Sequence, residues 1–337
     1  MKTIAWSLCA VASLATAALV SAQVSVPPPW AYGYTAPGPD PVAPPCSHES
    51  KPLDCARMQT RRPDDVVLSL PGSEGKFTEF QIHYDYGPAD WYPGDHPSMP
   101  DIVAHGRERD KIRACALCHY PNGLGKPENG PAGALPAAYI LEQLDAFRKG
   151  TRRSADSRKA NTNEMIQIAR HLTADDMKTV SEYFSALEWR PWVKVIEAES
   201  VPKTRAGVNG LFIPLAGNET EPLGKRMLEV PENPEFTERL RSPRSGFVAY
   251  VPVGSVAKGE VLVTKGGGKT VQCAVCHGTD LQGMANVPGI ADRPVSYLVR
   301  QLYDMQQGTR QSTLMKPVVA NLNDDDMMAI AAYLAWK

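Results

Sequence analysis

The sequence predicts a mainly α-helical protein in which two copies of one helical module are joined by an extended, partly β-stranded connector. Two observations support this prediction directly: an internal repeat, and helical spacing of the apolar residues within each copy. A third is the 30 prolines, which exclude regular helix from long stretches outside the repeat. At 337 residues the chain is long enough for about two domains. Its 36 basic and 37 acidic residues leave no positive surplus, which argues against nucleic-acid binding.

The first 22 residues have the pattern of an export signal. Lys2 precedes an apolar run from Ile4 to Val20, and small residues end at Ala22, just before Gln23. This order predicts cleavage after Ala22 and export to the periplasm of a Gram-negative bacterium. An uncleaved membrane anchor is the alternative, because the apolar run is near the lower limit for a spanning helix.

Residues 23–100 form a proline-rich arm. Cys46 and Cys55 are the two cysteines that lie outside both the signal and the repeated motif. They enclose a short polar loop, and exported cysteines meet an oxidising compartment. We expect a structural disulfide between them, with free thiols or pairing across chains as the alternative.

The repeat begins with the motif Cys-x-x-Cys-His. Residues 115–119 align with residues 273–277 at an offset of 158, and the offset persists for more than thirty residues. It then falls to 150, because the first copy has eight extra residues between Arg152 and Met165. The matched positions include Tyr139 with Tyr297, Gln143 with Gln301, Gly150-Thr151-Arg152 with Gly308-Thr309-Arg310, and Met165 with Met315. We call residues 101–190 module 1 and residues 255–337 module 2.

Each module shows helical periodicity. An apolar stripe at a spacing of three to four residues is followed by a glycine, which favours the end of a helix. Thr173 and Asn323 precede the last helix of their modules, and each has an aspartate three residues later, as in a helix N-cap. The stripe consists of Ile140, Leu141, Leu144 and Phe147 in module 1, and of Leu298, Val299, Leu302 and Met305 in module 2.

Residues 191–254 connect the modules. Short β-like runs at Val193–Ile196, Leu211–Ile213 and Phe247–Val251 are broken by proline and glycine. We expect this connector to pack against the modules rather than to form a domain of its own.

The motif Cys-x-x-Cys-His is typical of covalent haem attachment. Two thiols on one helical turn can reach the two vinyl groups of haem, and the next histidine can bind the iron. A zinc site is the alternative, but zinc needs four ligands and each motif supplies three. We therefore expect two haem c groups, one held by Cys115, Cys118 and His119 and the other by Cys273, Cys276 and His277.

Met165 and Met315 are the candidates for the sixth iron ligand. They occupy equivalent positions, 50 and 42 residues after the first cysteine of each motif, despite the length change just upstream. A lone methionine is usually core filler, and we assign that role to Met177 and Met327, which lie on the stripe of the last helix. His171 aligns with Asn321, so we do not expect it to be a ligand. The same holds for His48, His83, His96 and His105.

These features give the two modules a resemblance to the tandem class I domains of dihaem cytochromes c of the c4 type. The resemblance rests on Cys-x-x-Cys-His, the helix ending in Gly-Thr-Arg and the methionine before a capped last helix. It implies a periplasmic carrier of single electrons between a quinol-oxidising membrane complex or a dehydrogenase and a terminal oxidase. The N-terminal arm and the connector depart from that family and suggest docking surfaces.

Iron with both axial positions filled by protein exchanges electrons rather than binding substrate, so we expect a carrier and not an enzyme. One alternative is a haem subunit bound permanently to a dehydrogenase or respiratory complex, and hence peripheral to the membrane. A less favoured alternative is a dihaem peroxidase, which needs an open iron. Six basic residues between Arg148 and Lys159, with one acid, could steer an acidic partner or balance haem carboxylates, or could form a solvated loop.

Overall fold

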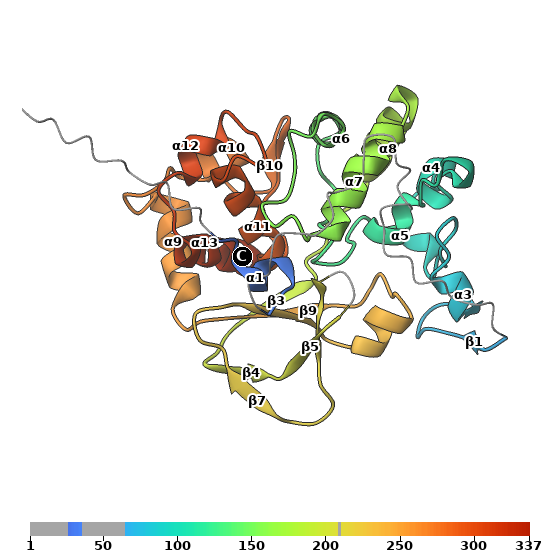
Figure 1. Cartoon of the computed structure of the whole chain (residues 1–337), viewed down its shortest axis with the longest axis horizontal. Helices are drawn as coiled ribbons and strands as arrows, with labels where there is room; N and C mark the ends of the chain where they lie inside the picture. The colour runs from blue at the N-terminus through green and yellow to red at the C-terminus, as the bar shows by residue number, and fades with distance from the viewer. Residues whose placement is uncertain (1–25, 36–64, 208–209) are drawn as a thin grey trace, which may run out of the picture.

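The computed structural model describes residues 26–35, 65–207 and 210–337. The helices of module 2 and those of module 1 lie on opposite sides in Figure 1, and most of the connector strands lie below them. The expected signal segment, Cys46, Cys55 and His48 fall outside the described residues. The cleavage site and the disulfide therefore stay predictions.

Module 1 has five α-helices among the described residues, and a short 3-10 helix at Glu108–Asp110. The α-helices are α4 (Asp101–Ala104), α5 (Cys115–His119), α6 (Ala137–Lys149), α7 (Ala160–His171) and α8 (Ala174–Ser185). Ile140 and Leu144 of α6 share a buried cluster with Val180 and Phe184 of α8. Gly150 ends α6 with a φ of 72°, a left-handed conformation that favours glycine. The predicted cap of α8 is present, because Thr173 and Asp176 form a reciprocal capping box.

Module 2 repeats this order with longer flanking helices. They are α9 (Ser255–Lys265), α10 (Ala274–His277), α11 (Val295–Gln306), α12 (Met315–Val319) and α13 (Asp324–Trp336), and a hairpin pairs β10 (Gly283–Met284) with β11 (Val287–Pro288). Asn323 and Asp326 form the capping box of α13. The backbones of α9 and α13 approach closely at Gly259, where a Cβ atom would lie 2.0 Å from the carbonyl oxygen of Ala329. Only glycine fits there.

Outside residues 208–209, the connector contains seven strands: β3 (Val193–Glu197), β4 (Ser200–Pro202), β5 (Thr204–Ala206), β6 (Phe212–Pro214), β7 (Thr220–Pro222), β8 (Leu228–Pro231) and β9 (Phe247–Val251). A three-stranded sheet has the order β3-β9-β8, with β3 parallel and β8 antiparallel to β9. The pairs β4-β7 and β5-β6 are antiparallel. Phe247, Ala249 and Val251 belong to the core of module 2. Val201, Leu223 and Leu228 form a smaller cluster within the connector itself.

The described parts of the N-terminal arm, residues 26–35 and 65–100, pack onto the rest of the chain. It contains α1 (Pro29–Tyr32), β1 (Val67–Leu68), β2 (Phe77–Thr78) and α3 (Glu79–Ile82), and β1 pairs with β2. Trp91 is 1% exposed, and its ring N–H donates to the carbonyl of Leu240 in the connector at 2.7 Å. Tyr32 is fully buried in the core of module 2. The arm thus closes over both the connector and module 2.

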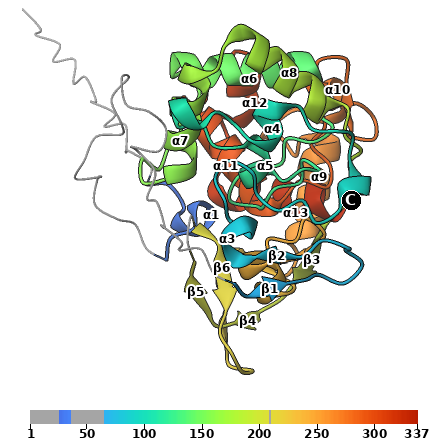
Figure 2. The same cartoon turned by 90° about the vertical axis from the view of Figure 1, so that its right-hand side faces the viewer.

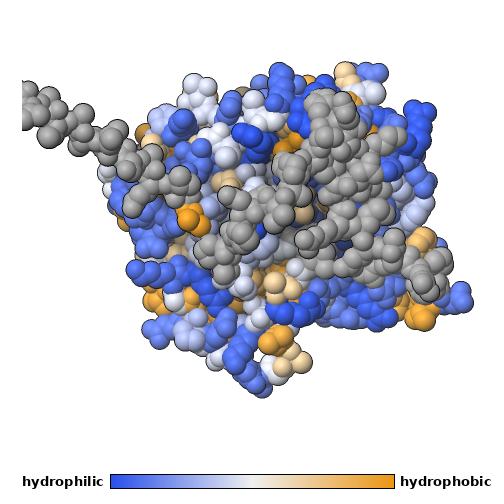
Figure 3. Space-filling model, in the orientation of Figure 1, coloured by the Kyte–Doolittle hydropathy of each residue, from blue (hydrophilic) through white to orange (hydrophobic). Residues whose placement is uncertain are grey.

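The surface is mostly hydrophilic on the face drawn in Figure 3, where hydrophobic side chains form small separate groups around the grey atoms. Within the described residues, no helix is both long and apolar enough to cross a membrane.

A buried glutamate joins the connector to module 2. Glu229 of β8 is 4% exposed and accepts from the backbone N–H groups of Val295 (3.0 Å) and Ser296 (3.3 Å), and also from the hydroxyl of Ser296. Two of the free N–H groups at the start of α11 are thereby satisfied, and the negative charge faces the positive end of the helix.

We expect Glu229→Ala to lower the free energy of unfolding by about 2 kcal/mol, because it leaves buried donors without an acceptor. Guanidinium unfolding of the haem-loaded chain, followed by tryptophan fluorescence, measures this change. The control is Glu232→Ala, which removes an exposed ion pair with Lys194 and should cost less than about 1 kcal/mol. Equal losses in the two variants would contradict the capping role.

Candidate haem-binding sites

The single turn α5 presents the first Cys-x-x-Cys-His motif to the interior of module 1. The Nδ1 atom of His119 lies 3.1 Å from the carbonyl oxygen of Gly130, to which it donates. This bond leaves Nε2 as the nitrogen with a free lone pair, the state that binds metals. Burial lowers the pKa of His119, which keeps the imidazole neutral for ligation.

The four residues predicted to form the first site line one cavity. Cys115, Cys118 and His119 come from α5, and Met165 comes from α7. The structure thus brings together residues up to 50 positions apart in sequence. The walls are mainly apolar and include Leu135, Ile140, Leu144, Phe147, Ile168, Leu172, Val180 and Phe184.

The chemistry of this cavity fits a covalently attached haem. Burial raises the pKa of Cys115 to about 12 and that of Cys118 to about 11, so both sulfurs are neutral in the folded chain. Conversion to thioethers leaves them neutral and therefore adds no buried charge. Apolar walls suit a flat macrocycle, and an imidazole with a free Nε2 suits its iron.

A second, polar cavity borders the first and shares Cys118, His119, Met165 and Tyr297 with it. Among its other lining residues are the guanidinium groups of Arg113, Arg152, Arg153 and Arg300. Glu128, Glu164 and Asp304 also line this cavity, which therefore has four arginines and three carboxyl groups in its walls. An apolar cavity beside a charged one that contains arginines fits a haem, which is apolar except for its two carboxylates.

The second motif has the same histidine bond but a more open setting. His277 is 8% exposed, and its Nδ1 donates to the carbonyl of Pro288 at 2.8 Å, the position equivalent to Gly130. Burial lowers its pKa as well. Cys273 and Met315 both pack against the core of module 2, whereas Cys276 is exposed.

The two modules meet through the repeated Gly-Thr-Arg segments. The N–H of Arg153 donates to the carbonyl of Thr309 at 2.8 Å, and the N–H of Gln311 donates to that of Thr151 at 2.9 Å. At the repeat offset of 158, Thr151 corresponds to Thr309 and Arg153 corresponds to Gln311. Each of the two bonds is therefore the counterpart of the other, and the contact has an approximate twofold symmetry. The contact joins module 1 to module 2 through equivalent segments of the two copies.

Side chains follow the same symmetry. Arg152 donates to Gln143 at 3.0 Å and to Gln301 at 3.1 Å. Arg310 donates to Gln301 at 2.8 Å, to Gln143 at 3.1 Å and to the hydroxyl of Tyr139 at 2.6 Å. These hydrogen-bond partners are all neutral, and Asp304 is an acid that acts electrostatically on Arg310. A buried cation is costly unless an anion balances it. The cluster therefore provides a basic environment for haem carboxylates. The sequence showed that these residues recur in the two modules, but it did not show that they contact one another across the interface.

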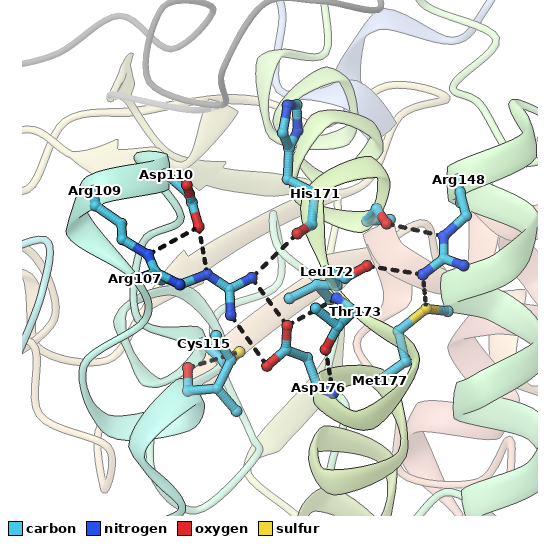
Figure 4. Close-up of polar contacts among 12 residues, drawn as sticks. Arg107, Arg109, Asp110, Cys115, Arg148, His171, Leu172, Thr173, Asp176 and Met177 are labelled. Carbon is cyan, nitrogen blue, oxygen red and sulfur yellow. Dashed lines mark hydrogen bonds and ion pairs between the residues drawn. The ribbon is translucent and has the colours of Figure 1, made fainter.

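The basic stretch from Arg148 to Lys159 is largely occupied within the molecule. In Figure 4, Arg148 reaches the carbonyls at the end of α7 and the sulfur of Met177. Arg158 pairs with Asp156 at 2.6 Å, and Lys159 is 2% exposed. Arg152 lies in the interface between the modules. Of the six basic residues in this stretch, Lys149 and Arg153 are the two that are exposed. A solvated basic loop and a steering surface are both wrong descriptions of this stretch as a whole.

The remaining histidines in the described residues form hydrogen bonds with protein groups away from the two cavities. His171 donates from Nδ1 to Gln167, and its carbonyl accepts from Arg107, which also binds Asp176 (Figure 4). His83 bonds the carbonyl of Arg239 at 2.9 Å, and His105 bonds that of Tyr86 at 3.3 Å. His96 lies 3.2 Å from Asp90. None of these histidines lines either cavity.

Comparison with known proteins agrees with this chemistry. The model described as "Cytochrome c" matches residues 110–188, and that described as "Cytochrome C oxidase, cbb3-type, subunit III" matches residues 254–334. Cytochrome c-554(548) of Halomonas halodenitrificans is 37% identical over 65 residues, which are 18% of this chain and 78% of that protein. The fold and the two sites define a c-type cytochrome, and the chain belongs to the cytochrome c family.

Two longer relatives specify the type. The thiosulfate dehydrogenase electron acceptor of Stutzerimonas stutzeri is 39% identical over 82 residues, and cytochrome c4 of Pseudomonas aeruginosa is 38% identical over 71. The matches cover 23% and 21% of this chain, and 38% and 35% of those proteins, so the chain spans little more than a third of their length. This chain is a dihaem class I cytochrome c that resembles the c4 type, with two covalently bound haem c groups.

Proposed function

We propose that this chain is a periplasmic carrier of single electrons, exported by a signal peptide that is cleaved after Ala22. It takes electrons from a dehydrogenase or a quinol-oxidising membrane complex and passes them to a terminal acceptor such as an oxidase. The observation that supports this most strongly is the cavity that Cys115, Cys118, His119 and Met165 line together. With haem bound, His119 and Met165 would both supply iron ligands from the protein, which would leave no open iron for a substrate.

We assign thioether attachment to Cys115 and Cys118 in module 1, and to Cys273 and Cys276 in module 2. His119 with Met165, and His277 with Met315, would supply the iron ligands. The haem supplies a one-electron iron couple when bound. The chain holds the imidazole in place through the carbonyl of Gly130 or Pro288 and excludes water with apolar walls. A thioether ligand in an apolar setting favours ferrous iron and a positive potential.

The relatives support a dehydrogenase as electron donor. One is named a thiosulfate dehydrogenase electron acceptor, and another, from Chlorobaculum tepidum, a cytochrome subunit of sulfide dehydrogenase. These names describe those proteins. For this chain they favour a donor enzyme that releases single electrons.

Purification from the periplasmic fraction tests location and assembly together. We expect a chain that begins at Gln23, carries the mass of two haems and elutes without a large partner. Retention of residues 1–22 would contradict cleavage, and a stoichiometric dehydrogenase would favour the subunit alternative. Peroxide consumption by the reduced protein would contradict a carrier with both axial positions filled.

A further inference from the structure

Asp304 is a buried carboxylate at the meeting point of three parts of the chain. It lies on α11 and is 6% exposed. Its Oδ1 atom accepts from the hydroxyl of Tyr32 at 2.6 Å and from the backbone N–H of Ala155 at 2.8 Å. Tyr32 belongs to α1 of the N-terminal arm, and Ala155 precedes α7 of module 1. Helix α1 lies beside α11 in both views (Figures 1 and 2).

Asp304 also borders the first candidate haem site. It lines the polar cavity that Cys118, His119 and Met165 line as well. Its position places a titratable carboxyl group in the wall of the same cavity as the predicted iron ligands. Fully buried Tyr32 covers the carboxylate, so the surroundings have a low dielectric constant.

Several charges face this carboxylate. Arg300 lies one turn earlier on α11 and donates to the carbonyls of Ala31 at 2.7 Å and Pro127 at 2.6 Å. Arg310 follows the same helix and donates to neutral groups. The charged or titratable groups that act on Asp304 or on its neighbour Lys159 are Tyr32, Arg300, Arg310, Glu128 and Asp156.

Together these groups hold the pKa of the Asp304 carboxyl group close to the neutral range. Burial raises the pKa of Asp304 to about 6, although the bonds from Tyr32 and Ala155 and the two arginines act in the opposite direction. Burial and Arg300 lower the pKa of Lys159 to about 7. A small change in local charge would therefore change proton occupancy near neutral pH.

We propose that Asp304 is a redox-linked proton site of module 1. This rests on the proposed function: a one-electron donor protein supplies one electron to the module 1 site, reducing Fe(III) to Fe(II). One proton from solvent then binds a carboxylate oxygen of Asp304, and it leaves again on reoxidation. No covalent bond other than this O–H bond forms or breaks. An added negative charge in a low-dielectric setting raises the proton affinity of its neighbours, which gives the coupling its direction.

The test is a spectroelectrochemical titration of the haem-loaded chain between about pH 5 and 8. Met165→His and Met315→His assign the two waves, since each lowers one potential. In wild type, we expect the module 1 potential to level off below about pH 6, where Asp304 is already protonated in the oxidised state. Above that it should fall as pH rises, with a slope approaching about 59 mV per pH unit for one proton per electron.

Asp304→Asn should flatten this slope, and the control Asp145→Asn, which changes an exposed acid on α6, should not. Tyr32→Phe keeps the ring and removes a bond that stabilises the carboxylate, so the inflection should move to higher pH. An infrared difference spectrum should show a protonated carboxyl band on reduction in wild type and not in Asp304→Asn. The band supports the proposal even where the asparagine variant folds poorly.

A pH-independent module 1 potential in wild type would overturn the proposal and leave the carrier function intact. A slope that persists in Asp304→Asn but disappears in Lys159→Met would overturn the assignment to Asp304. Loss of haem or of reversible reduction in wild type would instead contradict the proposed function.

Discussion

A chain in which Cys115 and Cys118 are both alanine is expected to carry one covalent haem instead of two. The proposed thioether bonds of module 1 use these two sulfurs, and the second motif has its own pair, Cys273 and Cys276. Intact mass and the pyridine haemochrome spectrum should both fall by one haem equivalent. The mirror variant, in which Cys273 and Cys276 are alanine, should lose the other haem.

The matched control replaces Cys46 and Cys55 by serine. These cysteines lie outside both motifs, so two haems should remain. If the predicted disulfide forms, this control should change stability but not haem content. Two haems on the first variant, or loss of haem from the control, would contradict the assignment.

Met165→His is expected to lower the midpoint potential of one haem by at least on the order of 0.1 V, within the range of about 0.8 V that axial ligands control. Imidazole is a stronger donor than thioether sulfur and favours ferric iron. Optical redox titration measures the shift. Met177→Leu is the control, because Met177 is 3% exposed in the core of module 1 and lines neither cavity. Unchanged potentials in Met165→His, or an equal shift in Met177→Leu, would contradict ligation by Met165.

Local features of the fold could be predicted because they depend on neighbouring residues. The caps at Thr173 and Asn323 follow from hydrogen bonds within four residues of sequence, and both are present. The helical stripe was predicted with one error. Leu141 is 41% exposed, whereas its counterpart Val299 is fully buried. The reason is packing, since α11 has α1, α12 and α13 around it and α6 has α7 and α8.

Contacts between distant segments could not be predicted in the same way. Strands β3 and β9 pair in parallel across the whole connector, and Tyr32 reaches Asp304 from the other end of the chain. Alternation and capping patterns identify an element but not its partner. The repeated Arg152 and Arg310 show the same limit, because their recurrence does not reveal that they meet across an interface.

The candidate site followed more directly from the sequence. Thiol spacing on one turn predicts the attachment chemistry. Met165 and Met177 both recur in module 2, and the apolar stripe of the last helix is what separated Met177, as core filler, from the candidate ligand Met165. The excess of basic residues at 148–159 did not predict their role, because composition does not show whether a side chain points to solvent or into the molecule. Arg148 and Arg152 have backbone carbonyls and amide groups as partners inside the molecule.

The near-infrared spectrum of the oxidised, haem-loaded chain tests the central proposal most directly. A methionine sulfur bound to low-spin ferric haem gives a sulfur-to-iron charge-transfer band, which the proposed ligands predict at an intensity of two haems per chain. Met165→His and Met315→His should each remove half of it. A band equivalent to one haem, or a high-spin signature from either iron in wild type, would contradict a carrier with two histidine–methionine haems.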